Sequence, residues 1–288
     1  IGAGRVGAVL ASALRAAGHA VVGASAVSRE SLDRVDALLP GVPVLEIPTV
    51  VQRAELVLIT VPDDALPELV AGLAATRAWQ PGQLVVHTSG RFGWRVLEPA
   101  VAGGAIPLAL HPAMTFTGTS LDLSRLVECS FGVTAPAPVL PIAQALVVEM
   151  GAEPVVIAEE MRGLYHSALA HGSNHLVTLV AQALDLLRAA GVESPGRMLG
   201  PLLSAALDNA LRAGDGALTG PVARGDAGTV ASHVQAIGLA DQAAGGSASV
   251  LETYRALARA TADRALASGR LRPDAAEALL GALRSDAK

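Results

Sequence analysis

The sequence predicts an α/β domain with a parallel sheet, followed by an all-α domain with one long central helix. Three observations carry this prediction. A glycine-rich turn opens the chain, and short β-branched runs then alternate with helical stretches, which is the pattern of strands joined by crossover helices. Beyond Ile157 the strand pattern stops, and an apolar-periodic stretch runs unbroken over residues 159–190. We therefore expect two domains, at residues 1–157 and 158–288.

The opening turn, Ile1-Gly2-Ala3-Gly4-Arg5-Val6-Gly7, has the spacing G-x-G-x-x-G. In a dinucleotide-binding fold the first glycine permits the tight turn and the second lets the backbone approach the pyrophosphate. The third lets the helix pack on the strand, and the N-terminus of that helix faces the phosphates. Ile1 fits the last residue of a strand, and residues 6–17 fit a small-residue helix that ends at Gly18. The turn predicts a Rossmann domain whose cofactor contacts include Gly2, Gly4, Arg5, Val6 and Gly7. A purely structural glycine turn is the alternative.

The remaining elements follow from local patterns. Short apolar and β-branched runs predict strands, and apolar residues at helical spacing, bounded by glycine or proline, predict helices. The expected strands cover residues 20–24, 56–61, 84–87, 106–111, 131–134 and 154–157. The expected helices beyond the first cover residues 31–39, 66–75, 141–150, 159–190, 200–212, 229–244, 249–268 and 273–284.

Composition narrows the function classes. The formal net charge of -5 disfavours a nucleic-acid partner. No run of about 18 apolar residues is free of glycine, proline and charge, so we expect no membrane span. No basic segment with a cleavage site is visible, and the single Cys129 excludes an internal disulfide, so a cytoplasmic protein fits best. The only lysine is Lys288, which argues against a Schiff-base or phosphate-loop lysine.

The tip of the second expected strand indicates which nicotinamide cofactor binds. NAD enzymes place an acidic residue there for the ribose 2′-hydroxyl, whereas NADP enzymes use arginine and small hydroxyls for the 2′-phosphate. This chain has Ala24-Ser25-Ala26-Val27-Ser28-Arg29, with no acid at the tip and Glu30 next. We expect Ser25, Ser28 and Arg29 to hold NADP(H), since a guanidinium and hydroxyls suit a phosphate. A solvated loop arginine is the alternative.

Polar residues also follow three later strands, at the carboxyl ends where ligands bind in open α/β sheets. These stretches are Val61-Pro62-Asp63-Asp64, His87-Thr88-Ser89-Gly90 and His111-Pro112. We expect cofactor contacts at Val61, Pro62, Asp63, Thr88 and Ser89. A helix cap at the aspartates and a simple turn at residues 87–90 are the alternatives. His111 can reach the cleft, or it can be a buried histidine satisfied by backbone.

The long helix and one later loop carry the other candidates. His166 and Ser173 fall on one helical line with Asn174 beside it, and an asparagine buried there would need a polar partner such as a substrate carbonyl. His171 and His175 have the i,i+4 spacing of two metal ligands, but no third ligand is evident, so we expect no metal. In the loop at residues 218–226, the Arg224 guanidinium suits a carboxylate, and a capped loop without ligand is the alternative.

Together these stretches resemble the 6-phosphogluconate dehydrogenase C-terminal-like superfamily, which includes ketopantoate reductase and pyrroline-5-carboxylate reductase. Within it the chain is most similar to predicted oxidoreductases with a Rossmann-like domain and a helical domain of unknown function. The matching stretches span almost the full length and are Val61–Asp64, His87–Gly90, His111-Pro112, Tyr165–Asn174 and Thr219–Asp226. The resemblance implies an NADP-linked reductase, a homodimer and an active cleft between the domains. This chain departs from several relatives in one respect. They use a lysine in the helical domain for proton transfer, whereas its only lysine is the last residue, Lys288.

From these residues we expect reduction of a small 2-keto acid or related carbonyl by NADPH, with ketopantoate as the first substrate to test. His166 is the expected proton donor and His111 the second candidate. Asn174 would polarise the carbonyl and Arg224 would hold the substrate carboxylate. A cyclic-imine reductase on the same fold is one alternative. A non-catalytic NADP(H)-binding protein that senses the cofactor or docks a partner is the other.

Overall fold

The computed structural model describes residues 1–245 and 250–284. It divides into two compact units, Ile1–Ser173 and Asn174–Lys288, called here the N-terminal unit and the helical unit. The division falls inside helix α8 (Arg162–Ala189), whereas the sequence places it at residues 157 and 158, before this helix. The first turns of α8 therefore belong with the N-terminal unit, and each unit is described by itself below.

The N-terminal unit is built on one sheet in the order β1-β2-β3-β4-β5. Strands β1, β2 and β3 are parallel, as predicted, and β5 is parallel to β4. Strand β4, however, runs antiparallel to β3, because the chain returns between them through a loop and a short helix instead of a full crossover. The strands are β1 (Leu56–Ile59), β2 (Leu84–His87), β3 (Ile106–Pro112), β4 (Ser130–Thr134) and β5 (Glu153–Val156).

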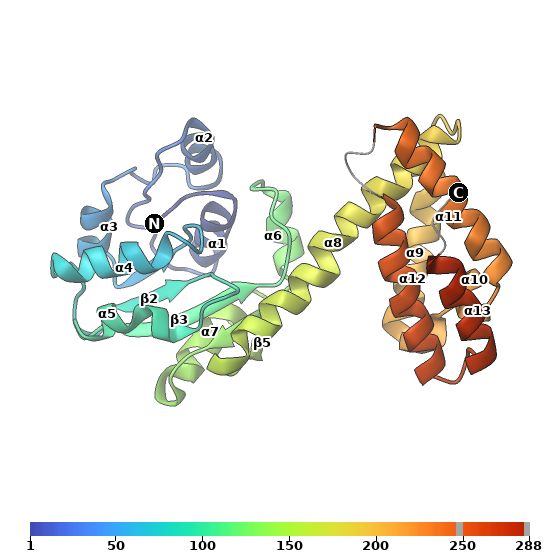
Figure 1. Cartoon of the computed structure of the whole chain (residues 1–288). Coiled ribbons are helices and arrows are strands. Elements are labelled where there is room, and N and C mark those ends of the chain that lie inside the picture. Colours follow the sequence, from blue (N-terminus) through green and yellow to red (C-terminus); the bar gives the residue numbers. More distant parts are fainter. Residues whose placement is uncertain (246–249, 285–288) are drawn as a thin grey trace. The chain divides into compact units, whose positions relative to one another are not determined.

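Helices cover both faces of this sheet (Figure 1). Alternate residues of the strands point to opposite faces, so Leu58 and Val86 pack with α1, α6 and α7, whereas Val57 and Val85 pack with α3, α4 and α5. This is the doubly wound arrangement expected of the predicted fold class. The helices are α1 (Arg5–Ala16), α2 (Arg29–Leu38), α3 (Ile47–Arg53), α4 (Leu66–Ala75), α5 (Glu98–Val101), α6 (Leu121–Leu126) and α7 (Leu140–Glu149).

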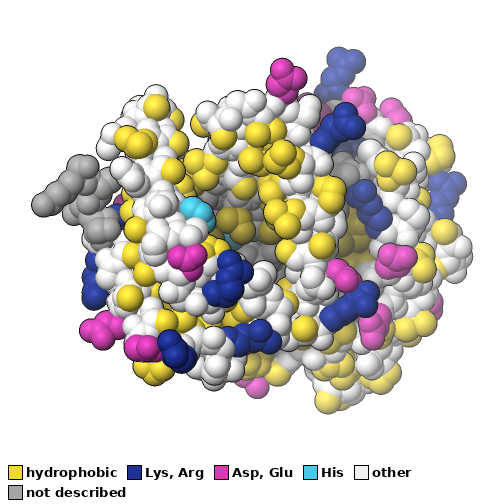
Figure 2. Space-filling view, turned by 90° about the vertical axis from the view of Figure 1, so that its right-hand side faces the viewer, with side chains coloured by type: hydrophobic (Ala, Val, Ile, Leu, Met, Phe, Trp, Pro, Cys, Tyr) yellow, Lys and Arg dark blue, Asp and Glu magenta, His cyan; other side chains and the backbone are white. Residues whose placement is uncertain are grey.

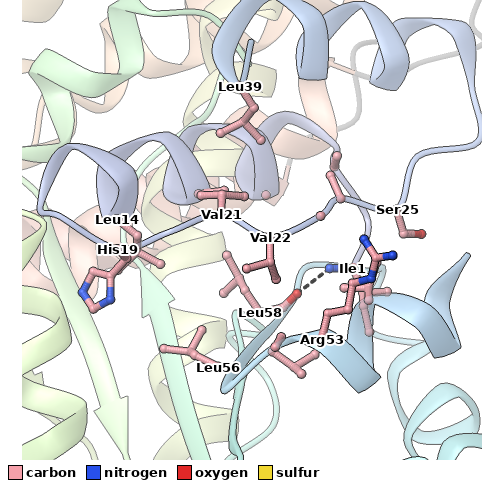
Figure 3. A pocket seen from close by; sticks show the side chains of 18 of the residues that line it. Ile1, Leu14, His19, Val21, Val22, Ser25, Leu39, Arg53, Leu56 and Leu58 are labelled. Carbon is pink, nitrogen blue, oxygen red and sulfur yellow. Dashed lines mark hydrogen bonds between the residues drawn. The ribbon is translucent and has the colours of Figure 1, made fainter. Parts of the chain in front are cut away.

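Residues 20–24, predicted to be a strand, do not join the sheet. Among the described residues, their one ladder contact is a bridge between Ala24 and Val44. The segment is separated from β1 by a cavity of about 440 Å³ with mainly apolar walls (Figure 3). Only at one end is the gap bridged, where the Ile1 nitrogen donates to the Leu58 carbonyl (2.6 Å) and the Ala3 N–H donates to the Ser25 carbonyl (2.9 Å). These bonds place Ile1 to Ala3 between β1 and this segment.

The helical unit contains the second half of α8 and the helices that follow it (Figure 1). Its core is formed by small and aliphatic side chains of α10 to α13, including Val230, Ala262 and Leu279. Helix α9 begins earlier than the predicted residue 200, because a proline is compatible with the first turn of a helix. The predicted helix start at Ser249 lies outside the described residues. The helices are α9 (Pro195–Ala213), α10 (Gly220–Arg224), α11 (Ala227–Ala243), α12 (Val250–Ala267) and α13 (Pro273–Arg284). No helix in the described ranges is long and apolar enough to cross a membrane.

Candidate functional site

The glycine turn has the geometry that a dinucleotide requires. Gly2 has φ 83°, a left-handed conformation that a glycine adopts without strain. A Cβ atom on Gly7 would lie 2.3 Å from Thr60 Oγ1, so this glycine allows α1 to approach the strand end. A Cβ atom on Gly4 would meet only the Gly2 carbonyl, at 3.9 Å, and the space beside it is open. The turn thus provides the close approach of backbone to ligand that a pyrophosphate needs.

The N-terminus of α1 is prepared for an anion. No side chain caps it in the described structure, and its first turn contains no acidic residue. Its N–H groups and the positive end of the helix dipole can therefore interact with phosphate oxygens. The predicted contact Arg5 is exposed at this turn, and a Cβ atom on Gly118 would lie within 3.0 Å of the side chains of both Arg5 and Arg34.

Arg34 is a further candidate for cofactor binding that the sequence pattern did not reveal. Its side chain lies near that of Arg5 because both contact the loop around Gly118, which is distant in the sequence. That loop is fixed by Asp122, which is fully buried and accepts hydrogen bonds from the N–H groups of Thr117 (2.8 Å) and Gly118 (2.7 Å). These bonds hold the pKa of the Asp122 carboxyl below its usual range, against the opposing effect of burial. The fixed loop brings Gly118 against the two arginines.

The expected 2′-phosphate residues lie at the start of α2. Ser28 is the N-cap of this helix, and its hydroxyl accepts a hydrogen bond from the Ser31 N–H (3.2 Å). Arg29 is exposed beside it, and Ser25 is buried, with its carbonyl bonded to Ala3 of the glycine turn. Ser25 is thereby joined to the turn directly. Hydrogen bonds with its own backbone and with Ser28 lower the pKa of the exposed Glu30 carboxyl, so this neighbour stays ionised.

The carboxyl ends of β1, β2 and β3 meet at one edge of the sheet, as their parallel pairing requires. Val61 and Asp63 are half-buried there and Pro62 is exposed. The turn after β2 is largely occupied by its own hydrogen bonds. His87 is fully buried, its Nδ1 accepts from the Ser89 N–H (3.2 Å), and its Nε2 contacts the Gly93 carbonyl (2.8 Å). Ser89 is also buried, whereas Thr88 is half-buried.

A second group of side chains gathers at this edge, from β3 and the first turns of α8. The Tyr165 hydroxyl is 2.9 Å from His111 Nδ1, and the His166 ring lies edge-on to the His111 ring, with centroids 5.8 Å apart. A Cβ atom on Gly90 would lie 2.5 Å from His166 and 2.9 Å from His111 Nε2. The glycine therefore leaves the room in which both rings meet the turn after β2. The sequence pattern indicates His111 and His166, and the structure brings them together.

Arg162 anchors this group and was missed at the sequence level. Its guanidinium is 1% exposed and donates to the carbonyls of Phe92 (2.9 Å), Gly132 (3.1 Å) and Ser89. The clue in the sequence is its position, one turn before His166 on the same helix face. Tyr165, also missed as a site residue, packs against Gly132, where a Cβ atom would lie 2.6 Å from the Tyr165 hydroxyl.

Burial, together with the positive charge of Arg162, lowers the pKa values of the neighbouring histidines. Burial, followed by the positive charge of Arg162, lowers the pKa of His111 from 6.5 to about 4. Burial likewise lowers the pKa of His87 to about 4. Both imidazoles are therefore neutral near pH 7, and the positive charge in this part of the sheet edge resides on Arg162. A neutral imidazole can accept a proton or donate a hydrogen bond, depending on its tautomer.

The other two predicted catalytic residues belong to the helical unit. Asn174 is exposed on α8, and Arg224 is exposed at the last residue of α10. Asp226 caps α11, as expected, by accepting from the Thr229 N–H (3.0 Å). The roles assigned to Asn174 and Arg224 stay predictions. Among the described residues, no group of three histidine, cysteine, aspartate or glutamate side chains is gathered as metal ligands.

Comparison with known families identifies both parts of the chain. A Rossmann-like domain matches residues 1–112, and the family described as a domain of unknown function, DUF2520, matches residues 129–261. The chain thus combines a Rossmann-like domain with a DUF2520 domain. This combination confirms the predicted resemblance to proteins with a Rossmann-like domain and a helical domain of unknown function. No curated protein matches the sequence.

Solved structures share the fold of this Rossmann-like and DUF2520 pair at low identity. A candidate NADP oxidoreductase from Bacteroides fragilis is 22% identical, with 91% of this chain and 96% of that chain covered and a TM-score of 0.71. The protein TM1727 from Thermotoga maritima is 20% identical, with 92% and 98% covered and a TM-score of 0.71. An imine reductase from Myxococcus stipitatus, in complex with NADP+, is 17% identical, with 98% of each chain covered and a TM-score of 0.61.

The neutral histidines predict how stability depends on pH. In the unfolded chain a histidine titrates near pH 6.5, whereas His87 and His111 titrate at about 4 in the native state. Between these values the unfolded chain binds protons that the native protein does not, so stability falls as the pH falls. Linkage gives a loss of about 2 kcal/mol per histidine between pH 7 and pH 5. His111→Asn should reduce this loss by about that amount in urea unfolding. The exposed His171→Asn is the control, and equal losses in both variants would contradict the assignment.

Proposed function

We propose that this protein is an NADP(H)-dependent reductase of a small carbonyl compound. The observation that carries the proposal is that two features of a reductase site lie at one edge of the sheet. An uncapped helix N-terminus at the glycine turn and the cluster of Arg162, His111, Tyr165 and His166 both belong to the carboxyl ends of the same parallel strands. Open α/β sheets bind ligands at this edge. The names of the similar structures, an NADP oxidoreductase and an imine reductase with NADP+ bound, support an oxidoreductase.

The residues present fit the adenine half of NADP(H). The open space at Gly4 and the N–H groups of α1 would hold the pyrophosphate, with Arg5 and Arg34 beside it. The exposed Arg29 and the Ser28 hydroxyl would hold the 2′-phosphate, because no acidic side chain stands at the tip after Ala24. When bound, the cofactor supplies the hydride. A single buried cysteine, Cys129, without a disulfide is in keeping with the cytoplasmic location that we infer.

The side chains at the edge can supply the remaining chemistry. As hydride adds to the carbonyl carbon, the oxygen gains negative charge and then a proton, which gives the alcohol. We assign the proton to His166, which is half-buried beside His111 and open to one side, whereas His111 is held by Tyr165. The buried positive charge of Arg162 stabilises negative charge that develops nearby. A small 2-keto acid is the substrate class that we propose first, and a cyclic imine is the second, supported by the similarity to an imine reductase.

The first test uses NADPH fluorescence with purified protein, followed by addition of ketopantoate. We expect the fluorescence to increase on binding, more strongly with NADPH than with NADH at equal concentration, and then to decay as the cofactor is oxidised. Arg29→Ala should reduce the preference for NADPH while leaving NADH binding almost unchanged. Increase without decay for keto acids and for cyclic imines alike would favour a non-catalytic NADP(H)-binding protein. No response to either nucleotide would remove the proposal.

The role of His166 has its own test. His166→Ala should lower kcat by about 10²-fold or more, the usual contribution of a general acid, while the Kd for NADPH stays within about twofold of the native value. His171→Ala, on an exposed face of the same helix, is the matched control and should leave kcat near its native value. Native turnover in His166→Ala, combined with loss in His111→Ala, would transfer the assignment to His111.

We also propose that the protein is a homodimer that associates through α9 and the second half of α8. Helix α9 has 19 residues, of which only Pro195 is buried, although leucines recur along it. Four large apolar side chains on it are exposed, namely Met198, Leu202, Leu207 and Leu211. Figure 2 shows one face of the molecule, on which many hydrophobic side chains are exposed. Exposed apolar patches are typical of protein–protein interfaces. Leu202→Glu with Leu211→Glu should convert a dimer into a monomer in light scattering. A monomeric native protein at micromolar concentration would exclude the proposal.

A further inference from the structure

The two ring nitrogens of His111 have different surroundings in the N-terminal unit. The Nδ1 atom lies 2.9 Å from the Tyr165 hydroxyl, so it meets the first turns of α8. A Cβ atom on Gly90 would lie 2.9 Å from the Nε2 atom, so Nε2 meets the turn after β2. This turn follows the carboxyl end of a parallel strand, where ligands bind in open α/β sheets. Of the two nitrogens, Nε2 is therefore the one that faces the candidate site.

The Tyr165 hydroxyl has a hydrogen to donate and one suitable acceptor for it. Burial raises the pKa of this phenol, so the O–H group is intact near neutral pH. The charge of Arg162 and a hydrogen bond with the Gly132 backbone oppose this shift, and a bond that lowers the pKa of a phenol is one that its oxygen accepts. The Arg162 guanidinium, 5.4 Å from the centre of the ring, contains no acceptor. The hydroxyl therefore donates to His111 Nδ1.

This bond fixes the tautomer of His111. A neutral imidazole whose Nδ1 accepts a hydrogen bond carries its proton on Nε2. Burial, followed by the charge of Arg162, keeps the ring neutral near pH 7 by lowering its pKa to about 4. Within the described part of the chain no residue accepts from Nε2, yet this atom is not one of the fully buried polar atoms that lack a partner. The half-buried ring thus leaves an N–H donor open to a bound molecule.

We propose that Tyr165 is a positioning residue that holds His111 as the Nε2–H tautomer, and that this N–H donates a hydrogen bond to the carbonyl oxygen of the substrate. The inference rests on the proposed reductase function and divides its chemistry between two histidines. His111 polarises the carbonyl and keeps its proton, whereas His166 delivers a proton to the oxygen once hydride has added to the carbon. A donor fixed in place before the reaction stabilises the negative charge on oxygen without reorganisation.

Imidazole ¹⁵N NMR on the full chain tests the tautomer without any turnover. Near pH 7 we expect a protonated Nε2 and an unprotonated Nδ1 in His111, whose signals the spectrum of His111→Gln identifies. Tyr165→Phe removes one oxygen and keeps the ring against Gly132, and it should shift both signals toward the average of two tautomers. Tyr254→Phe is the matched control, because the Tyr254 hydroxyl is 2.9 Å from Nδ1 of His233 in the helical unit. It should leave the signals of His111 unchanged. A proton on Nδ1 in the native protein, or native signals in Tyr165→Phe, would overturn the inference.

Two substitutions of His111 test the hydrogen bond to the substrate. His111→Gln keeps an N–H group near the position of Nε2, whereas His111→Met has a similar length and no donor. With NADPH and ketopantoate, His111→Met should lower kcat by about 10²-fold or more, as the loss of one oxyanion donor does, and His111→Gln should restore about tenfold of this. Tyr165→Phe should lower kcat by about two- to tenfold, the equilibrium factor of one neutral hydrogen bond. Equal losses in the glutamine and methionine variants would overturn the role of His111 as a donor.

The oxidised cofactor separates this inference from the reductase proposal. NADP+ has no hydride to give to ketopantoate, so the His111 Nε2 signal in their complex with the protein reports the hydrogen bond alone. We expect this signal to shift, and to shift less in Tyr165→Phe. An unchanged signal in protein that binds NADPH by fluorescence would overturn the inference and leave the cofactor site intact. The expected tautomer and shift without turnover would instead remove the reductase proposal and support the role of Tyr165.

Discussion

The arrangement of the N-terminal unit depends on one buried cation. Arg162 has no buried carboxylate among its described partners and is instead held by the carbonyls of Ser89, Phe92 and Gly132. These carbonyls come from the turn after β2 and from β4, so one guanidinium ties α8 to both parts of the sheet edge. Burying an ion in this way is costly unless its donors are satisfied. The three carbonyls accept from its Nε, Nη1 and Nη2 groups, and the carboxylates of Glu159 and Asp63 favour its charged form from nearby. The positive charge can act on a group that binds beside it.

Two glycines leave the space that the aromatic rings at this edge of the sheet occupy. Gly90 leaves space for the His111 and His166 rings, and Gly132 leaves space for the Tyr165 ring. A side chain at either position would push these rings away from Arg162. The cluster is therefore specified as much by missing Cβ atoms as by the polar side chains that a sequence motif records. The glycine turn is similar, because the missing Cβ atom of Gly7 leaves the space that the Thr60 side chain occupies.

Local patterns predicted most of the fold and part of the site. The parallel strands β1 to β3 and the long helix follow from periodicity, and His111 and His166 follow from their places at a strand end and on that helix. Periodicity could not show that residues 20–24 stand apart from β1, because ladder formation depends on a neighbouring strand and not on the segment itself. The sequence did not reveal Arg162 and Arg34 as site residues for a similar reason. Their roles arise from carbonyls and a loop far away in the sequence.

The buried arginine also bears on how a reductase of this group could work without an internal lysine. A lysine in such a site supplies two things, a positive charge and a proton. In this chain the two are separated: Arg162 keeps its charge at any physiological pH, and the proton must come from a neighbouring group. Arg162 also helps to lower the pKa of His111, which makes that imidazole a poor store of a proton near pH 7. In the reaction that we propose, we therefore assign proton donation to His166, whose ring lies beside that of His111.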